Sequence, residues 1–392
     1  MKTALRPADF ARAVFFALLP AAAAGGAMAL PLLLSLAALA ALGPALFRQV
    51  LEKRPLVLAI LLLLAFWAEF TSLWSPWDGP TGLKVLALLA LGLCFVAAAG
   101  ANEKAGALTL SAAAAAFLVL AVLLGVEAAF DMPLNRAIQP ELAEGELNRN
   151  PSRGLIVLLA LTWPVVAWLL AHRRGWSATL AGAIMIAACA LSLQFDQLVT
   201  AIGLGASSLV FAIALFARRF AILVTSFGLA VWMLFAPFVT PLLVSNPQLV
   251  ESVPLSWAHR IAIWRYTCAR ILEQPWFGHG IDSGRTTTDM LVIRGLETRG
   301  IPVHPHSASL QVWHDLGLVG ALLSAALLAY GGLRLSRAFA HDRYAAAATA
   351  AVLSMFGLMA NVGWSVWQEW WMATLLLTAA LIGALGARAA RA

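Results

Sequence analysis

Long apolar runs without a single charge constrain the fold of this chain more than any other feature. The stretch from Leu56 to Phe66, for example, contains only leucine, valine, isoleucine, alanine and phenylalanine. Backbone polar groups in hydrocarbon must be hydrogen-bonded within their own segment, and a helical span needs roughly 20 apolar residues. A β-barrel would instead show alternating residues in strands of about ten. With 62% hydrophobic and 11% charged residues, the sequence predicts an all-α polytopic membrane protein.

Charged breaks between the apolar runs predict about twelve transmembrane helices. They cover residues 10–24, 27–47, 56–74, 82–100, 105–127, 153–171, 177–194, 197–217, 220–244, 310–333, 344–362 and 365–387. The first run follows Lys2, Arg6 and Arg12, as the apolar core of a signal peptide would. Another apolar run follows almost at once, which favours a retained first span, with a cleaved signal peptide as the alternative.

Basic residues predict the orientation of these helices, because short cytoplasmic connections are enriched in Lys and Arg. With a cytoplasmic N-terminus, most of the 26 Lys and Arg residues fall on the cytoplasmic side, and both termini lie there. These residues are Lys2, Arg6, Arg12, Arg48, Lys53, Arg54, Lys104, Arg173, Arg174, Arg218, Arg219, Arg334, Arg337, Arg343, Arg388 and Arg391. The net charge of +7 is then largely an orientation signal, so we expect no nucleic-acid partner.

The segment 245–309, on the outer side, is far richer in ionisable groups than the rest of the chain. It holds six arginines, no lysine and four of the seven histidines. A guanidinium is a planar fork of donors that matches phosphate oxygens, so a segment with arginine alone at a membrane surface indicates a phosphate-bearing ligand. The alternative is that these arginines contact lipid headgroups or pair with acidic residues of the same segment.

Residues 256–272 predict an amphipathic helix with Ser256 as its N-cap. Its apolar face comprises Ile261, Trp264, Cys268, Ile271 and Leu272. At about 100° per residue, Arg260 and Arg265 flank that face, whereas Arg270 points away from it. We therefore predict Arg260 and Arg265 as pyrophosphate ligands. Arg153, at the outer entrance of the sixth span, is predicted to face the same cavity.

The motif His304-Pro305-His306-Ser307 comes immediately before the tenth span. The prolines keep this stretch out of a helix, and Ser307 or Ser309 is expected to cap the span that follows. A histidine here can accept a proton from a sugar hydroxyl near neutral pH. His306 is our first choice as the base and His304 the second; a structural histidine is the alternative. A metal site is a weaker interpretation, because no Asp-x-Asp or His-Glu-x-x-His motif accompanies the pair.

Six tryptophans near the expected outer ends of spans predict an interfacial aromatic belt, with sugar stacking as the alternative. They are Trp74, Trp77, Trp364, Trp367, Trp370 and Trp371.

Two pieces of the sequence resemble the O-antigen ligase and polymerase superfamily of bacterial membrane glycosyltransferases. The first consists of His259-Arg260, Ile263-Trp264-Arg265 and Pro275-Trp276-Phe277-Gly278-His279-Gly280, similar to the family's Arg/Trp helix and Pro-x-x-Gly-x-Gly turn. The second is His304-Pro305-His306-Ser307 with the segment from Leu310 to Gly320, similar to the family's His-Asn-x-x-Leu-Gln and Glu-Leu-Gly motifs. Ser307 stands where the family usually has Asn, and Asp315 where it usually has Glu.

This resemblance implies an inverting glycan transfer without cofactor, metal or nucleotide sugar, in the bacterial inner membrane and with the site facing the periplasm. The donor would be O-antigen linked to undecaprenyl pyrophosphate and the acceptor lipid A-core, among the membrane lipids. A ligase is favoured over a polymerase, and a secondary transporter of an anionic lipid or sugar is the alternative from another class. The expected layout is similar to the GT-C class: spans one to nine in residues 1–244, a periplasmic catalytic loop with short helices in 245–309, and the last three spans in 310–392.

Overall fold

The structure of the chain is a computed structural model that describes residues 7–43, 55–141, 143, 146–172, 175–195 and 197–389. Within these ranges, eleven helices are long and apolar enough to cross a membrane, which confirms a polytopic membrane protein. They are α1 (Pro7–Ala24), α4 (Pro55–Phe70, continued by the short helix η1, Thr71–Leu73), α5 (Thr81–Ala99), α6 (Glu103–Ala129), α8 (Arg149–His172), α9 (Ser177–Gln194), α10 (Leu198–Phe216), α11 (Arg218–Leu243), α14 (Ala308–Ala338), α15 (Arg343–Val362) and α16 (Glu369–Ala389).

The expected second span appears as α2 (Leu30–Ala41), which has 12 residues in the described part of the chain. Its predicted end at residue 47 lies outside the described residues, as do eight of the basic residues used for the orientation. Those eight are Lys2, Arg6, Arg48, Lys53, Arg54, Arg173, Arg174 and Arg391. The short helix α7 (Pro133–Ile138), which the sequence did not predict, connects α6 to α8. Glu127 holds it in place, because its carboxylate accepts from the backbone N–H of Leu134 at 2.7 Å.

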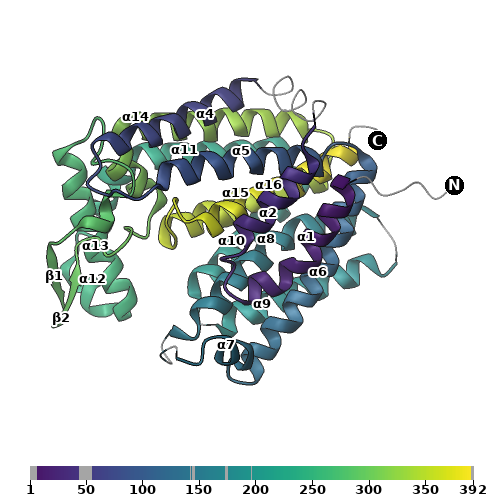
Figure 1. The fold of residues 1–392 in the computed structure, drawn as a ribbon, viewed down its shortest axis with the longest axis horizontal. Helices are drawn as coiled ribbons and strands as arrows, with labels where there is room; N and C mark the ends of the chain where they lie inside the picture. The colour runs from purple at the N-terminus through teal and green to yellow at the C-terminus, as the bar shows by residue number, and fades with distance from the viewer. Residues whose placement is uncertain are drawn as a thin grey trace.

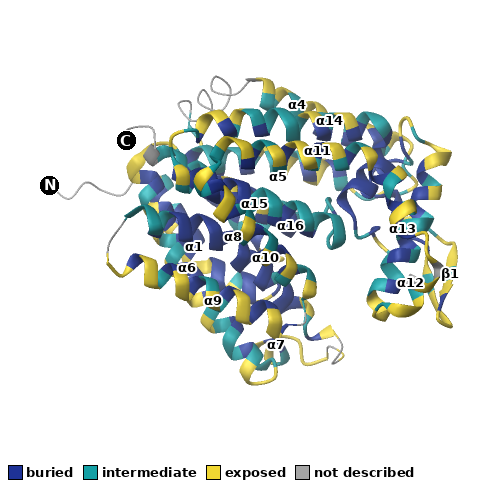
Figure 2. Cartoon of the chain, turned by 180° about the vertical axis from the view of Figure 1, so that it is seen from behind, coloured by how far each residue is buried: buried dark blue, intermediate teal, exposed yellow. Residues whose placement is uncertain are grey.

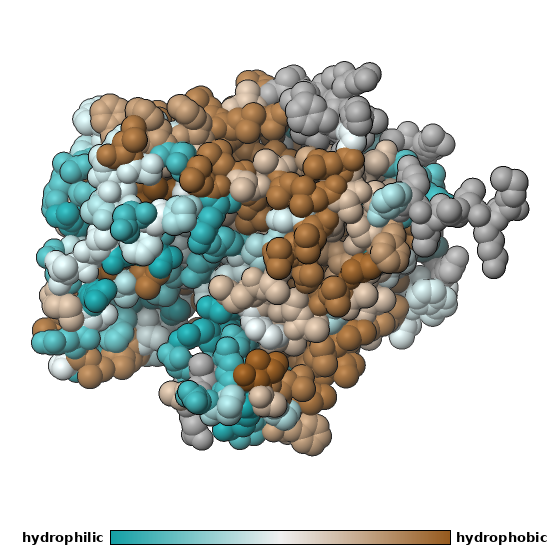
Figure 3. All heavy atoms as spheres, viewed as in Figure 1, coloured by the Kyte–Doolittle hydropathy of each residue, from teal (hydrophilic) through white to brown (hydrophobic). Residues whose placement is uncertain are grey.

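Helix α8 lies at the centre of the bundle and packs against α1, α6, α9, α15 and α16. Most of its residues are buried, and α8 and α15 are among the most enclosed helices of the chain (Figure 2). In contrast, α4 is mostly unburied and carries exposed Leu62, Leu63 and Phe66. Along one side of the molecule α14 packs between α4 and α11 (Figure 1). Large apolar side chains on the outer faces of the bundle match a lipid environment (Figure 3).

The segment between α11 and α14 contains two short helices, α12 (Pro247–Ser252) and α13 (Leu255–Glu273), and the 3-10 turn η3 (Ser283–Thr286). It also contains two antiparallel strands, β1 (Met290–Ile293) and β2 (Leu296–Arg299), where only helices were expected. Arg294 and Gly295 join the strands with φ of 50° and 80°. Both values lie in the left-handed region that two-residue hairpin turns need. The sequence analysis missed the hairpin because arginine rarely adopts this conformation. The segment is hydrophilic and lies at the end of the bundle opposite the start of α1 and the end of α16 (Figures 1 and 3).

Candidate active site

Helix α13 is the predicted amphipathic helix, with two differences. It begins at Leu255 with Pro254 as its N-cap, so the prediction of Ser256 as a cap was wrong. Ile261, Cys268 and Ile271 are buried as expected, whereas Leu272 is 63% exposed and does not belong to the packed face. The buried face contacts α11 and α14, which places the helix across the end of α11 and the start of α14.

The two histidines of the His-Pro-His motif lie side by side, with ring centroids 4.3 Å apart. Nδ1 of His306 donates to the Gly363 carbonyl at 2.8 Å, because a carbonyl can only accept. In the neutral ring Nε2 therefore carries the lone pair, and it has no hydrogen-bond partner among the described residues. His304 instead uses the lone pair of its Nδ1 to accept from the backbone N–H of His306 at 3.1 Å. Of these two histidines, only His306 has a basic nitrogen without a hydrogen bond to a described residue.

Burial keeps both imidazoles neutral. It lowers the pKa of His306 from its usual 6.5 to about 4; the Gly363 carbonyl opposes this, and the positive charge of Arg260 adds to it. The pKa of His304 is also lowered, first by burial and then by the charges of His306, Arg285 and Arg260. Arg260 on α13 therefore lies close enough to the histidine pair before α14 for its charge to act on both imidazoles.

The predicted arginines differ in how far their donors are engaged. Arg260 lies over the Trp257 ring at 5.4 Å, and its buried Nε has no hydrogen-bond partner in the described part of the chain. Arg265 instead donates from Nε to the Val244 carbonyl at 2.8 Å and from Nη2 to the same oxygen. It therefore satisfies the carbonyl that follows the last residue of α11. Arg270, expected in solvent, pairs with Glu273 at 2.5 Å.

Arg153 lies in the first turns of α8, over the Trp370 ring at 5.7 Å. Its Nε is buried and, among the described residues, unpartnered. Trp370 in turn packs edge-on against Trp364, which follows the Gly363 carbonyl that orients His306. Arg153 thus borders the turn between α15 and α16 that orients the histidine. Trp370 and Trp371 are 1% exposed, so the interfacial-belt prediction was wrong for these two residues.

The Pro-x-x-Gly-x-Gly turn is inserted into a break in α14. Gly317 leaves the helical conformation with φ of 65°, which interrupts the hydrogen bonds from residues 318 and 319 to residues 314 and 315. The turn replaces them on both sides. Its residues His279 and Gly280 donate to the carbonyls of residues 314 and 315 at 2.8 and 3.0 Å, while Leu318 donates to the Pro275 carbonyl at 2.8 Å.

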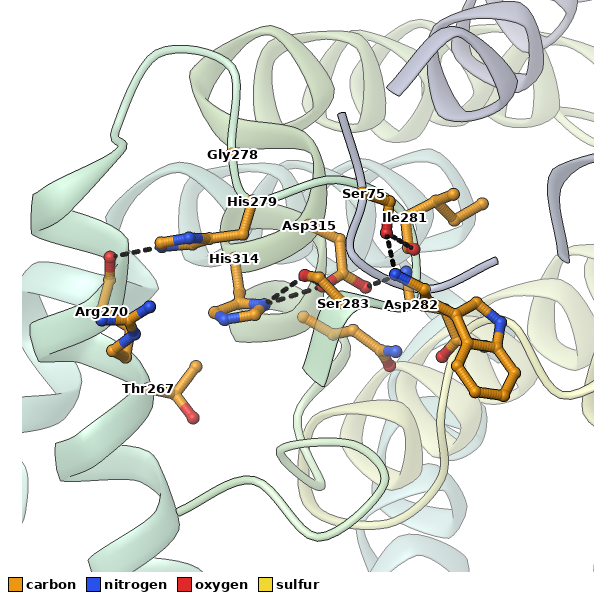
Figure 4. Close-up of polar contacts among 12 residues, drawn as sticks. Ser75, Thr267, Arg270, Gly278, His279, Ile281, Asp282, Ser283, His314 and Asp315 are labelled. Atoms are coloured by element: carbon orange, nitrogen blue, oxygen red, sulfur yellow. Dashed lines mark hydrogen bonds and ion pairs between the residues drawn. The ribbon is translucent and has the colours of Figure 1, made fainter. Parts of the chain in front are cut away.

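Asp315 anchors this junction from inside (Figure 4). Its Oδ1 accepts from His314 at 2.8 Å and from the Ser283 hydroxyl at 3.2 Å. Its Oδ2 accepts from the backbone N–H of Asp282 at 3.2 Å and from the indole N–H of Trp367 at 2.7 Å. One carboxylate thus ties the outer segment to the turn between α15 and α16, the same turn that orients His306.

Arg285, on η3, is a charged residue near the histidine pair that the sequence analysis did not select. Its Nε donates to buried Asp282 at 2.6 Å, and its guanidinium lies over the Trp77 ring at 5.3 Å. Burial raises the pKa of Asp282, while the bond to Arg285 lowers it. The absence of lysine from this arginine-rich segment was a signal for Arg285 as well. Helical periodicity, however, could rank the arginines of α13 alone, and Arg285 lies on η3.

Two open clefts flank the Pro275–Gly280 turn. The larger, about 720 Å³, is lined mainly by aromatic side chains, including Trp67, Trp74 and Phe277. The smaller, about 360 Å³, is apolar and lies between α11, α14 and Trp276. Among the described residues, no group of three or more His, Cys, Asp or Glu side chains is placed to hold a metal ion.

Fold and site together define a polytopic membrane protein with a segment rich in arginine and histidine at one end of the helical bundle. Residues 147–325 match the family model Wzy_C, described as O-antigen ligase. The match runs from just before α8 into α14 and therefore includes Arg153, Arg260, Arg265 and both histidines. It excludes Gly363 and Trp77, which contact the site from other parts of the chain.

Several curated Rickettsia proteins are distant relatives. The chain is 26% identical over 230 residues to a "putative polysaccharide ligase" of Rickettsia bellii, a match that covers 57% of this chain and 55% of that protein. Proteins of the same description from Rickettsia typhi and Rickettsia conorii are each 23% identical, over 56% and 57% of this chain and 55% and 54% of their own lengths. The chain thus spans about half the length of the curated relatives it matches.

Proposed function

We propose that the protein is an O-antigen ligase that transfers polysaccharide from undecaprenyl pyrophosphate to lipid A-core, with inversion and without a metal. One observation carries the proposal: His306 presents an uncommitted Nε2, oriented by the Gly363 carbonyl, and the charge of Arg260 reaches its imidazole. This combination of a base and a fixed cation suits the attack of a hydroxyl on a sugar whose leaving group is a diphosphate. The match to the family model described as O-antigen ligase supports the same function.

In the proposed reaction, Nε2 of His306 takes the proton of an acceptor sugar hydroxyl. The oxygen then forms a bond to the anomeric carbon of the donor while the bond from that carbon to the diphosphate oxygen breaks. Attack opposite the leaving group inverts the anomeric centre. His304 keeps the motif in place through its bond to the His306 backbone and is the second choice as base.

Arginine charge stabilises the departing diphosphate in this proposal. Arg260 has a buried Nε without a partner among the described residues, and so does Arg153 at the start of α8. Arg265 can join them only by exchanging the Val244 carbonyl for a phosphate oxygen. A bound diphosphate beside Arg260 would also offset the charge that lowers the pKa of His306. Donor binding would therefore make the imidazole a stronger base.

Reconstitution of the purified full-length protein with undecaprenyl pyrophosphate-linked glycan and lipid A-core tests the proposal. We expect transfer that withstands a chelator and falls about 100-fold or more in His306→Ala, the scale expected for a lost general base. His341→Gln, an exposed histidine between α14 and α15, is the control and should transfer normally. Undiminished transfer by His306→Ala would refute the mechanism.

A strain that lacks this protein distinguishes a ligase from a polymerase, and single substitutions distinguish both from a transporter. Unlinked polymer together with uncapped lipid A-core indicates a ligase, whereas lipopolysaccharide with a single repeat unit indicates a polymerase. A transporter would tolerate both His306→Ala and Arg260→Ala, because neither group lies within the apolar part of a span.

A further inference from the structure

Three arginines of the outer end share one arrangement, in which a guanidinium lies over an indole ring. The pairs are Arg153 over Trp370 at 5.7 Å, Arg260 over Trp257 at 5.4 Å and Arg285 over Trp77 at 5.3 Å. Stacking holds the plane of the guanidinium and leaves its edge of N–H donors available. Two of the three are already proposed as phosphate ligands, which draws attention to the third.

Arg285 is held more firmly than the other two. Its Nε donates to Asp282, whose side chain is 2% exposed, at 2.6 Å. The same carboxylate oxygen accepts from the Thr81 hydroxyl at 3.0 Å, and Thr81 accepts from the indole N–H of Trp77 at 3.2 Å. Hydrogen bonds thus connect Arg285 through Asp282 and Thr81 to Trp77, the residue whose ring lies under the guanidinium. Nη1 and Nη2 of Arg285 have no hydrogen-bond partner among the described residues, and its side chain is 32% exposed.

The fixed cation lies next to the histidine pair. A Cβ atom on Gly284 would stand 3.7 Å from the Val303 carbonyl, so η3 packs against the residue that precedes His304. The positive charge of Arg285 helps to lower the pKa of His304, as does that of Arg260 from α13. Two separate elements therefore direct positive charge at the same imidazole.

We propose that Arg285 binds a phosphate group of a lipid-linked substrate, through Nη1 and Nη2, as the η3 counterpart of Arg260 on α13. The inference rests on the proposed function and adds a ligand to that site. Two free N–H groups on one rigid fork form paired hydrogen bonds to a phosphate, which a lysine cannot reproduce. Both the diphosphate of the donor and a phosphate on the acceptor glycolipid offer this chemistry.

Loss of Arg285 alone would leave the buried Asp282 carboxylate without its cation. The test variant is therefore the double substitution Asp282→Asn with Arg285→Ala, and Arg285→Lys keeps the charge without the fork. Arg299→Ala, an exposed arginine of β2, is the matched control. Each full-length protein is titrated with geranylgeranyl pyrophosphate by calorimetry. We expect the Kd to rise about tenfold or more in the double variant, less in Arg285→Lys, and less than about twofold in the control.

The KM for lipid A-core in the reconstituted assay distinguishes the two sources of phosphate. A raised KM with unchanged prenyl diphosphate binding assigns Arg285 to the acceptor, and the reverse assigns it to the donor. If Arg285→Lys and a folded double variant change neither quantity, the inference is overturned; should the double variant not fold, Arg285→Lys decides alone. Failure of the proposed function would look different, because His306→Ala would then transfer glycan as well as the unsubstituted protein.

Discussion

The partner of each ionisable side chain decides what that side chain can do in this protein. Arg260 and Arg265 lie on the same helix, yet Arg260 has a buried donor without a partner among the described residues, whereas Arg265 is bound to the end of α11. His304 and His306 differ in the same way, since only His306 keeps a lone pair for a substrate. The amino-acid composition does not distinguish the members of either pair. Their hydrogen bonds separate the side chains that still have a free donor or lone pair from those already engaged by the described residues.

Acidification should destabilise the protein through the histidine pair. Above pH 6.5 the imidazoles are neutral in both the folded and the unfolded chain, so they add no pH dependence. As the pH falls from 6.5 toward the folded pKa of His306, about 4, the unfolded chain takes up protons first and stability is lost. His306 alone accounts for about 2 kcal/mol by pH 5.

Thermal unfolding of the purified protein at pH 7.5 and pH 5 measures this loss. His306→Gln removes one titrating group, so its Tm should fall less on acidification than that of the unsubstituted protein. His341→Gln should behave like the unsubstituted protein. Equal acid sensitivity in all three proteins would contradict the linkage.

Arg265→Ala should lower the free energy of unfolding by about 1–3 kcal/mol, because the Val244 carbonyl at the end of α11 loses its donors. Denaturant or thermal unfolding measures this change, and Arg299→Ala on exposed β2 serves as the control. An unchanged Tm in Arg265→Ala would show that its bonds to Val244 contribute nothing to the fold.

At the scale of elements, the site depends on a loop that completes a broken helix. The turn of residues 275–280 supplies donors and acceptors that α14 lacks around Gly317. Two glycines allow this close approach: a Cβ on Gly278 would lie 2.6 Å from the Asp315 carbonyl, and one on Gly317 would lie 2.4 Å from the Trp276 carbonyl. The junction positions η3 and the turn that orients His306, so its integrity controls the geometry of the site.

Gly278→Ala should therefore cost about 2 kcal/mol or more, since a positive φ of 73° and a steric clash act together. Gly295→Ala is the matched control: its φ is 80°, but nothing lies within 4 Å of the added Cβ, so it meets the backbone strain alone. Thermal unfolding and protease sensitivity of the outer segment report the difference. Equal losses in the two variants would mean that the close packing against α14 contributes no stability.

At the scale of the whole molecule, the outer segment and the turn between α14 and α15 lie at opposite ends of the bundle (Figure 1). We propose that the outer segment faces the periplasm, because Arg218, Arg334, Arg337 and Arg343 gather at the other end. Localisation in the inner membrane is part of the same proposal.

Cysteine labelling tests this orientation in a background without native cysteines. Arg299→Cys on β2 should react with a membrane-impermeant maleimide in intact spheroplasts. His341→Cys, in the turn between α14 and α15, should react only after permeabilisation. The opposite pattern would place the histidine pair in the cytoplasm and exclude a periplasmic glycan acceptor.

Span positions, the amphipathic helix and the His-Pro-His motif could be predicted from the sequence by itself, because hydrophobic length and periodicity are local properties. The boundaries of α9 and α15 agree with the predicted spans within a residue. The sequence placed Arg260, His304 and His306 in one segment, and in the structure the charge of Arg260 acts on both imidazoles. The hairpin β1–β2 and the short helix α7 were missed, because the first depends on one unusual turn and the second on a buried carboxylate.

Only the tertiary structure decided which of these residues have free donors. Gly363, Trp77 and Trp370 come from segments far from the arginine-rich loop: Gly363 orients His306, whereas Trp77 and Trp370 stack on Arg285 and Arg153. The hydrogen bond from Arg265 to the Val244 carbonyl likewise joins α13 to the end of α11, a contact that helical periodicity within α13 does not reveal. Helical periodicity tells which residues of one helix share a face. A site forms where several elements meet, and tertiary packing decides those contacts.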